Sequence, residues 1–260
     1  MRVGWRLGSG VAALAATSLA FVLILYGQQT ASTAPRHMDP QAQQALERVV
    51  QAMGGQPFLQ AKSLTTRGRI FFFQDGATAG FEPFQSWAVY PDKRRFSYGK
   101  TLPVVLINNG SQGWEIDKYG LITQPPEQLR IWALASRFSL ENSLRLRIHD
   151  PDVLVQYGNV DFIDNVPTQG IDLTMPGGIT VRIDLNRQTF LPARISYRIR
   201  NVKDQDWDEY SDAYADYKLI DRIQTPMHIT RYLNGERIGE TFRNFAHYNE
   251  EYPSNYFTPQ

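Results

Sequence analysis

The chain has 260 residues, enough for one large domain or two small ones, and 42% of them are apolar and 12% aromatic, which excludes a largely disordered chain. The net charge is +1 with acidic and basic residues interspersed, and this argues against binding of nucleic acid through overall charge. There are no cysteines, so disulfides, thiolate metal sites, cysteine nucleophiles and a lipidated N-terminal cysteine are excluded.

An apolar segment near the N-terminus predicts export. Arg2 and Arg6 precede an uncharged stretch whose apolar centre is Val11–Gly27. A helix over this centre spans about 25 Å at ~1.5 Å per residue, which is borderline for a bilayer. Residues 1–27 are therefore predicted to be either a cleaved signal peptide or an uncleaved anchor. In both cases the body is exported to the periplasm, and in the second it stays tethered to the inner membrane by residues 11–27.

A polar linker, residues 28–38, is followed by a helix predicted over residues 40–53. Asp39 supplies the N-cap and Pro40 occupies the first helical position, where proline is favoured. Gly54 and Gly55 end the helix. Apolar residues recur at helical spacing and form one face, which must lie on another part of the protein. They are Ala42, Leu46, Val49, Val50 and Met53.

From Lys62 onward the sequence consists of short runs rich in β-branched and aromatic residues, separated by turn residues. Several runs are joined by tight turns, as in residues 91–92, 108–113, 175–178 and 233–236, which predicts an antiparallel meander. The predicted strands are Ser63–Gln74, Glu82–Tyr90, Arg94–Gly99, Val104–Asn108, Gly113–Asp117, Val153–Val160, Thr168–Thr174, Ile179–Asn186, Pro192–Arg200, Asp206–Tyr217, Pro226–Leu233 and Glu236–Tyr248.

One segment interrupts the strands. Residues 125–146 favour helix and are bounded by Pro125-Pro126 and by the turn-forming residues 149–152. The fold class is therefore predicted to be mainly β with α. We expect a curved antiparallel sheet that forms an unclosed half-barrel, with the first helix and the helical insertion as covers and the insertion as a lid. Residues 39–260 are expected to form a single domain.

Motifs for catalysis are lacking. No G-x-S-x-G elbow follows the N-terminal segment, and no HExxH pair is present. The four histidines, His37, His149, His228 and His247, are scattered, and His228 on a predicted strand is interpreted as structural. We therefore predict a protein that is not an enzyme, with no catalytic residues, no metal and no cofactor.

The acidic stretch 204–217 partly resembles a calcium loop. Asp204, Asp206 and Asp208 match the first three carboxylate positions of an EF-hand. Glu209 stands where glycine belongs and Ala215 where glutamate belongs, so an acidic turn followed by a strand is the favoured interpretation.

The glycine-rich stretch 108–114 allows two interpretations. A phosphate-binding loop would need the lysine of a P-loop or a third glycine, and a helix after the loop, and this sequence has none of these. A hairpin turn fits better, because Asn109-Gly110 is a preferred turn pair with strand-like residues on both sides. The turn then sets the face to which Trp114 points.

Aromatic and aliphatic side chains at alternating positions suggest an apolar concavity under partial helical cover, which is suited to lipid. The alternative is that these side chains fill an ordinary core. The cavity candidates are Ile70, Phe72, Trp87, Phe96, Leu106, Trp114, Ile116, Leu129 and Trp132.

Several stretches together resemble one family. A helix that ends in a double glycine precedes Ala61–Ile70, and Tyr90–Ser97 resembles a Pro-Asp-Lys-x-Arg turn. Asn108–Trp114 resembles an Asp-Gly-x-x-Gly-Trp hairpin with Asn109 in place of the aspartate. Val181–Tyr197 and Asp216–Glu236 are similar to two later strand pairs. In order and spacing they resemble the LolA-like superfamily of outer-membrane lipoprotein-sorting proteins, over roughly residues 40–260.

This resemblance implies a half-barrel whose concave apolar face holds acyl chains. The expected function is that of an exported, non-catalytic lipid- or lipoprotein-binding protein, whose partners are acyl chains and, through the N-terminal segment, a membrane. The alternative is a cell-envelope interaction or sensor module of the same fold, with a filled core and a protein partner.

Overall fold

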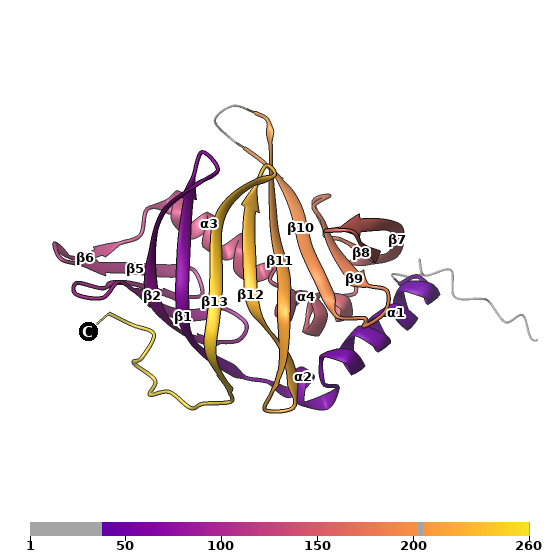
Figure 1. Ribbon diagram of the computed structural model, residues 1–260, viewed down its shortest axis with the longest axis horizontal. Coiled ribbons are helices and arrows are strands. Elements are labelled where there is room, and N and C mark those ends of the chain that lie inside the picture. The colour runs from indigo at the N-terminus through magenta and orange to yellow at the C-terminus, as the bar shows by residue number, and fades with distance from the viewer. Residues whose placement is uncertain (1–37, 202–204, 260) are drawn as a thin grey trace, which may run out of the picture. The chain divides into compact units, whose positions relative to one another are not determined.

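All strands belong to one antiparallel sheet that is assembled in an order different from the chain order. The computed structural model describes residues 38–201 and 205–259 (Figure 1). The first six strands are β1 (Ser63–Gln74), β2 (Ala77–Val89), β3 (Lys93–Tyr98), β4 (Val104–Asn109), β5 (Gln112–Asp117) and β6 (Gly120–Thr123). The remaining seven are β7 (Leu154–Ile163), β8 (Val166–Thr174), β9 (Thr180–Asn186), β10 (Pro192–Arg200), β11 (Trp207–Ile220), β12 (Ile223–Leu233) and β13 (Glu236–Tyr248).

The helices lie at the start of the described chain and between the two groups of strands. The first pair is α1 (Pro40–Met53) and α2 (Gln56–Gln60). The second group is α3 (Pro126–Arg137), α4 (Leu140–Arg145) and the 3-10 turn η1 (Arg147–His149).

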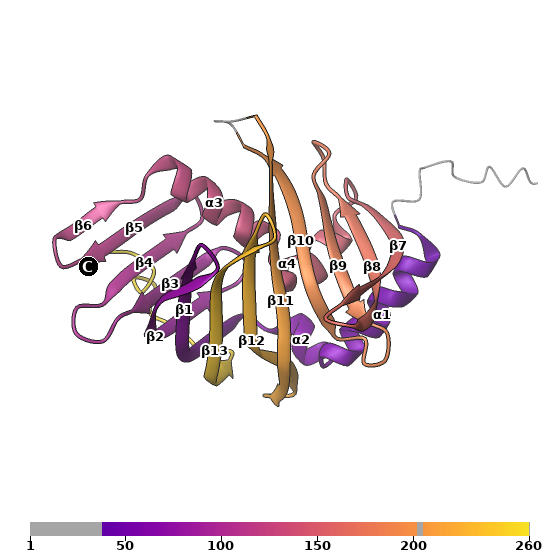
Figure 2. The same cartoon turned by 45° about the horizontal axis from the view of Figure 1, so that its top comes forward.

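The pairing of β1 with β13 joins the two groups of strands into one sheet, in the order β6-β5-β4-β3-β2-β1-β13-β12-β11-β10-β9-β8-β7. The two edges are therefore β6 and β7, the strands on either side of the helical insertion in the sequence. The sheet is curved and unclosed. Its insertion must run from one edge to the other, and Figures 1 and 2 show α3 and α4 behind the strands.

The helices share one face of the sheet, the concave face. Side chains of directly paired antiparallel residues point to the same face. By this rule Leu64, Ile183 and Ile195 lie on the concave face, and they belong to the same buried core as Val49 of α1 and Leu144 of α4. On each strand, the residues that alternate with these point to the opposite, convex face.

The core fills the concave face in front of β7–β10. The apolar stripe of α1 and the buried residues of α4 pack there against side chains that alternate along the strands. Its fully buried members include Val49, Leu140, Leu144, Val153, Ile171, Leu173, Ile183 and Leu185.

The sequence-based strands and the first helix are confirmed, with two instructive differences at their ends. The cap of α1 is as predicted, since the Asp39 carboxylate accepts from the Gln41 amide at 2.7 Å. Strand β2 begins at Ala77, five residues earlier than predicted, because Asp75-Gly76 forms a two-residue hairpin with positive φ at both positions. The short edge strand β6 was not predicted, and all four of its residues are exposed.

The helical insertion is two helices rather than one. Phe138 ends α3, and Ser139 starts α4 by accepting from the Asn142 amide at 3.3 Å. A serine that satisfies a free amide favours a new helix start over continuation of the old helix.

The predicted signal or anchor, residues 1–27, lies outside the described residues, as does the linker 28–38 apart from Met38. Among the described residues, no helix has both the length and the apolar character needed to cross a bilayer.

The docking of α1 gives a test of the fold. Leu46 is only 3% exposed and belongs to the main core, so we expect Leu46→Ala to lower the free energy of unfolding by about 2–5 kcal/mol. Gln44 is exposed on the same helix, and Gln44→Ala should change it by no more than about 0.5 kcal/mol. Urea denaturation of both variants measures the two effects. Equal effects would contradict the placement of α1.

Candidate functional site

An aromatic surface lies on the concave face of β1–β4, beside the filled core. Its ring centroids are closely spaced: Phe84 to Phe96 at 5.6 Å, Phe96 to Tyr98 at 5.8 Å and Tyr98 to Phe72 at 5.7 Å. The register places Ile70 and Leu106 on the same face. Phe72, Tyr98, Ile70 and Leu106 are only half-buried, so this surface is apolar and partly accessible. We refer to these six residues as the aromatic surface.

Helix α3 covers this part of the sheet loosely. None of its residues is buried, although its sequence is amphipathic. Leu129, Trp132 and Ser136 occupy one face of the helix at spacings of three and four. Leu129 contacts the sheet at Gly113, and the Ser136 hydroxyl donates to the Pro91 carbonyl at 2.9 Å, so helical spacing places Trp132 on the same face of α3 as these two contacts. A helix held at both ends with no buried residue is suited to act as a lid.

The base of this lid rests on a close approach at Gly113. The Asn108 amide donates to the Gln124 carbonyl oxygen at 2.8 Å, and the Gln124 amide donates to the Trp114 carbonyl at 3.2 Å. A Cβ on Gly113 would meet the Gln124 side chain, and it would lie 2.6 Å from Leu129 Cδ2. The glycine is therefore needed for packing, whereas Gly110, with φ of 59°, is needed for the turn.

Charged side chains gather in the middle of the concave face, where α4 crosses the sheet. Arg231 is paired with Asp212 through two bonds of 2.8 and 3.0 Å, which raises the pKa of Arg231. Burial, then the neighbouring charges of Arg231 and Arg243, lowers the pKa of Arg94 to about 10. The Arg231 side chain is not enclosed, since 51% of its surface is accessible.

Tyrosines line the same region. Burial raises the pKa of Tyr90, Tyr214 and Tyr217 well above the usual value, and it raises that of Tyr248 to about 12. Glu141 of α4 contributes to each of these shifts as a nearby negative charge. These phenols are therefore protonated at neutral pH. The Tyr217 hydroxyl donates to the Pro192 carbonyl at 2.8 Å, and the Tyr248 hydroxyl lies 3.1 Å from that of Thr225.

The nine predicted cavity residues separate into two sets. Four lie on the concave face by register, namely Ile70, Phe72, Phe96 and Leu106. Leu129 approaches that face from α3 at Gly113, and Trp132 shares the helix face of Leu129. The other three, Trp87, Trp114 and Ile116, lie on the convex face.

The pleat of the sheet explains this separation. Leu106 pairs with Glu115, whereas Trp114 pairs with Ile107, so adjacent strand residues alternate between the two faces. Trp87 instead meets the C-terminal segment, with its ring centroid 5.7 Å from that of Tyr256. The alternation of residues along a strand predicts that the strand has two faces. It does not reveal which residues of the next strand, after the turn, lie on the same face.

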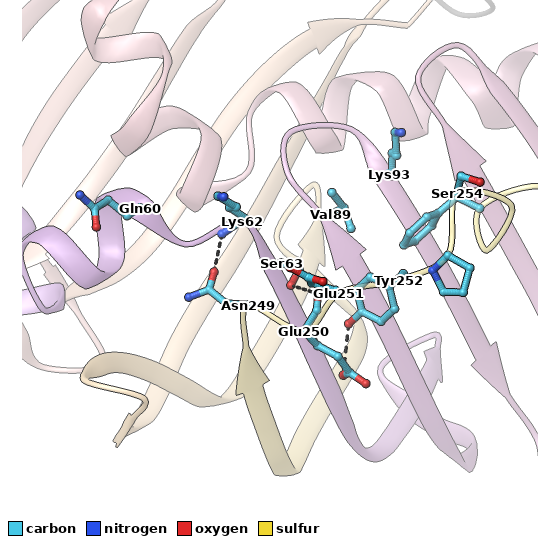
Figure 3. A pocket seen from close by; sticks show the side chains of 12 residues that line it. Gln60, Lys62, Ser63, Val89, Lys93, Asn249, Glu250, Glu251, Tyr252 and Ser254 are labelled. Atoms are coloured by element: carbon cyan, nitrogen blue, oxygen red, sulfur yellow. Dashed lines mark hydrogen bonds between the residues drawn. The ribbon is translucent and has the colours of Figure 1, made fainter.

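A pocket of about 810 Å³ lies on the convex side, between the C-terminal segment and β1–β3 (Figure 3). The Asn249 side chain accepts from the Lys62 amide at 2.8 Å, and Thr65 contacts both Glu250 and Tyr252. Most of its lining is polar or charged. It does not include the aromatic surface, and its chemistry does not suit acyl chains.

The arginine and tyrosine groups were not identified from the sequence. Arg94, Phe96 and Tyr98 are two residues apart along one strand, so their side chains point to the same face. This spacing is a sequence signal that could have placed Arg94 on the concave face. Arg231 and Arg243 come from β12 and β13, which join the sheet of Arg94 only through the β1–β13 pairing, and the sequence does not reveal that pairing.

The histidines form no shared site among the described residues. His228 lies 3.0 Å from Glu240 on the convex face, and His247 lies 2.9 Å from Asp221. No group of three or more potential metal ligands occurs in the described part of the chain. Asp204 of the acidic stretch lies outside it, and Asp208 accepts from Asn201 and Asn234.

Solved structures share this fold. A DUF1329 family protein from Desulfovibrio piger superposes with a TM-score of 0.54 at 10% identity, covering 83% of this chain and 96% of the other. A putative outer membrane lipoprotein-sorting protein domain from Vibrio parahaemolyticus gives a TM-score of 0.52 at 9% identity, covering 84% and 97%. No protein-family model matches the sequence, and no curated protein is detectably similar to it. The expected LolA-like fold is confirmed.

The contact at Gly113 yields a prediction about the lid. We expect Gly113→Ala to displace the Gln124 and Leu129 side chains and to lower the free energy of unfolding by about 1–3 kcal/mol. Hydrogen exchange of the α3 amides should accelerate. Gly80→Ala is the matched control, since a Cβ there meets no atom within 4 Å and its φ is ordinary. Faster exchange in both variants, or in neither, would contradict the role given to Gly113.

Proposed function

We propose that the protein is a non-catalytic lipid- or lipoprotein-binding protein that holds acyl chains between α3 and the aromatic surface. The observation that carries this proposal is an apolar, half-buried sheet face under a helix with no buried residue. Burial of each methylene of a chain contributes ~0.8 kcal/mol, so this surface can retain a long chain in water.

The way the helices cover the concave face supports ligand binding rather than a core that is closed throughout. In front of β7–β10 the space is filled by α1 and α4, so no ligand is needed there. In front of β1–β4 Phe84 and Phe96 are buried, but Phe72 and Tyr98 keep accessible surface. The Trp132 indole nitrogen is buried with no partner among the described residues. A bound molecule would cover the rings and offer an acceptor to this donor.

The wider setting is part of the same proposal. Arg2 and Arg6 followed by Val11–Gly27 support an exported protein in the periplasm, with residues 1–27 as signal or anchor and residues 39–260 as the lipid-binding domain. A second candidate function is an envelope interaction or sensor module. It is favoured by the filled half of the concave face, which leaves about half of the sheet without room for a ligand.

Uptake of a neutral acyl lipid tests the proposal. A fluorescent diacylglycerol should bind saturably to the full-length protein. Each methylene added to the acyl chains of the lipid should tighten binding up to about fourfold. Leu106→Gln should weaken binding about tenfold, because it removes half-buried apolar contact on the concave face.

Val105→Gln is the matched control, because this half-buried neighbour faces the convex side. Circular dichroism checks that both variants fold. An absence of saturable binding would overturn the proposal, and so would equal weakening by the two variants.

A further inference from the structure

Positive charge exceeds negative charge in the middle of the concave face. The charges on Arg94, Arg231, Arg243, Asp212 and Glu141 all interact electrostatically. Arg145 of α4 adjoins the same group, with its guanidinium 3.8 Å from the Tyr90 ring centroid. Four arginines face two carboxylates there, which leaves two positive charges in excess.

Two of these arginines have no carboxylate partner. Among the described residues, none lies within ion-pair distance of Arg94 or Arg243, whereas Arg231 is paired with Asp212. Arg94 Nε donates to the Ser86 hydroxyl at 3.3 Å, and Arg243 Nη1 donates to the Pro226 carbonyl at 3.0 Å. The Arg243 Nε is buried with no partner in the described chain. Enclosed guanidinium groups without a counter-charge are unfavourable unless an anion joins them.

The electrostatics of Arg94 favour the binding of an anion. The pKa of this group is about 10, below its usual value of 12.5, because burial and two neighbouring arginines disfavour its charged form. Since this pKa remains above neutral pH, the side chain is still charged there. A folded-state pKa below the unfolded value means that this charge opposes folding at neutral pH, and a bound anion would relieve the opposition.

The arginines adjoin the aromatic surface. The Arg94 guanidinium lies 4.5 Å from the Phe96 ring centroid, and both residues come from the same face of β3. Arg231 pairs with Gly239, which in turn pairs with Phe72. Gly239 has no side chain, so the arginine and the ring face each other across it. A molecule lying on the aromatic surface therefore ends at the arginines.

We propose that Arg94, Arg231 and Arg243 bind the anionic head group, a phosphate or a carboxylate, of the lipid whose acyl chains lie on the aromatic surface. Guanidinium groups match such oxygens with several directed donors. This inference rests on the proposed function, since the head group is placed by its chains.

Two probes with identical acyl chains separate the inference from the function on which it rests. Fluorescent phosphatidic acid should bind the full-length protein at least about tenfold more tightly than fluorescent diacylglycerol does, as expected for charge-assisted hydrogen bonds. Equal affinities would overturn the head-group site and leave the acyl-chain site standing. If neither probe binds, the proposed function itself fails. Inorganic phosphate that displaces phosphatidic acid at equal concentration would show a small-anion site, and it would overturn the lipid assignment.

Substitutions locate the site. Arg94→Gln and Arg243→Gln should each reduce the preference for phosphatidic acid over diacylglycerol by about tenfold. Arg69→Gln is the matched control, because Arg69 is exposed on the convex face of β1. A preference that survives in both concave-face variants would overturn the assignment.

Stability of the lipid-free protein distinguishes binding from a structural role. Arg94→Gln removes an enclosed charge that opposes folding, so the melting temperature without lipid should stay the same or rise. Phosphatidic acid should raise the melting temperature of the unsubstituted chain more than that of this variant. A large loss of stability in lipid-free Arg94→Gln would mean that Arg94 supports the fold instead.

Discussion

The pairing of β1 with β13 is the constraint on which the rest of the structure depends. It converts two successive meanders into one sheet and makes β6 and β7 the opposite edges. These edge strands flank a single connection in the sequence, so residues 124–153 must travel across a face of the sheet. A connection of this kind cannot lie at an edge or return in a tight turn. The helical cover of the concave face is therefore a consequence of topology, and α3 and α4 occupy that path (Figure 2).

The path divides the concave face into two unlike halves. Where α4 meets α1, branched aliphatic side chains interlock and leave a buried core. Where α3 crosses β1–β4, flat aromatic rings face a helix that buries none of its own residues. The arginines and tyrosines lie at the junction between the halves, where an amphiphile would change from chain to head group. One continuous sheet thus provides rigidity at one end and an accessible apolar surface at the other.

Local features were predictable from the sequence because they depend on neighbouring residues. The cap at Asp39, the meander strands and the turn at Gly110 all follow from local rules, and their structures agree. The β1–β13 pairing was not predictable, because nothing local specifies which distant strands meet. For the same reason the nine candidate residues were drawn from both faces, and Trp114 lies on the convex one. The position of the arginines on the concave face was not predictable either, because charged residues on strands ordinarily face solvent.

The central claim is that acyl chains bind under α3 rather than on the convex face, and the tryptophans report on this directly. Two variants of the full chain are needed, one retaining only Trp132 and the other only Trp114, with the remaining tryptophans replaced by phenylalanine. A diacylglycerol with brominated acyl chains quenches an indole that it contacts. The account predicts saturable quenching of Trp132, which lies on the face of α3 that contacts the sheet, and none of Trp114, which lies on the convex face. Quenching of Trp114 equal to or greater than that of Trp132 would contradict it.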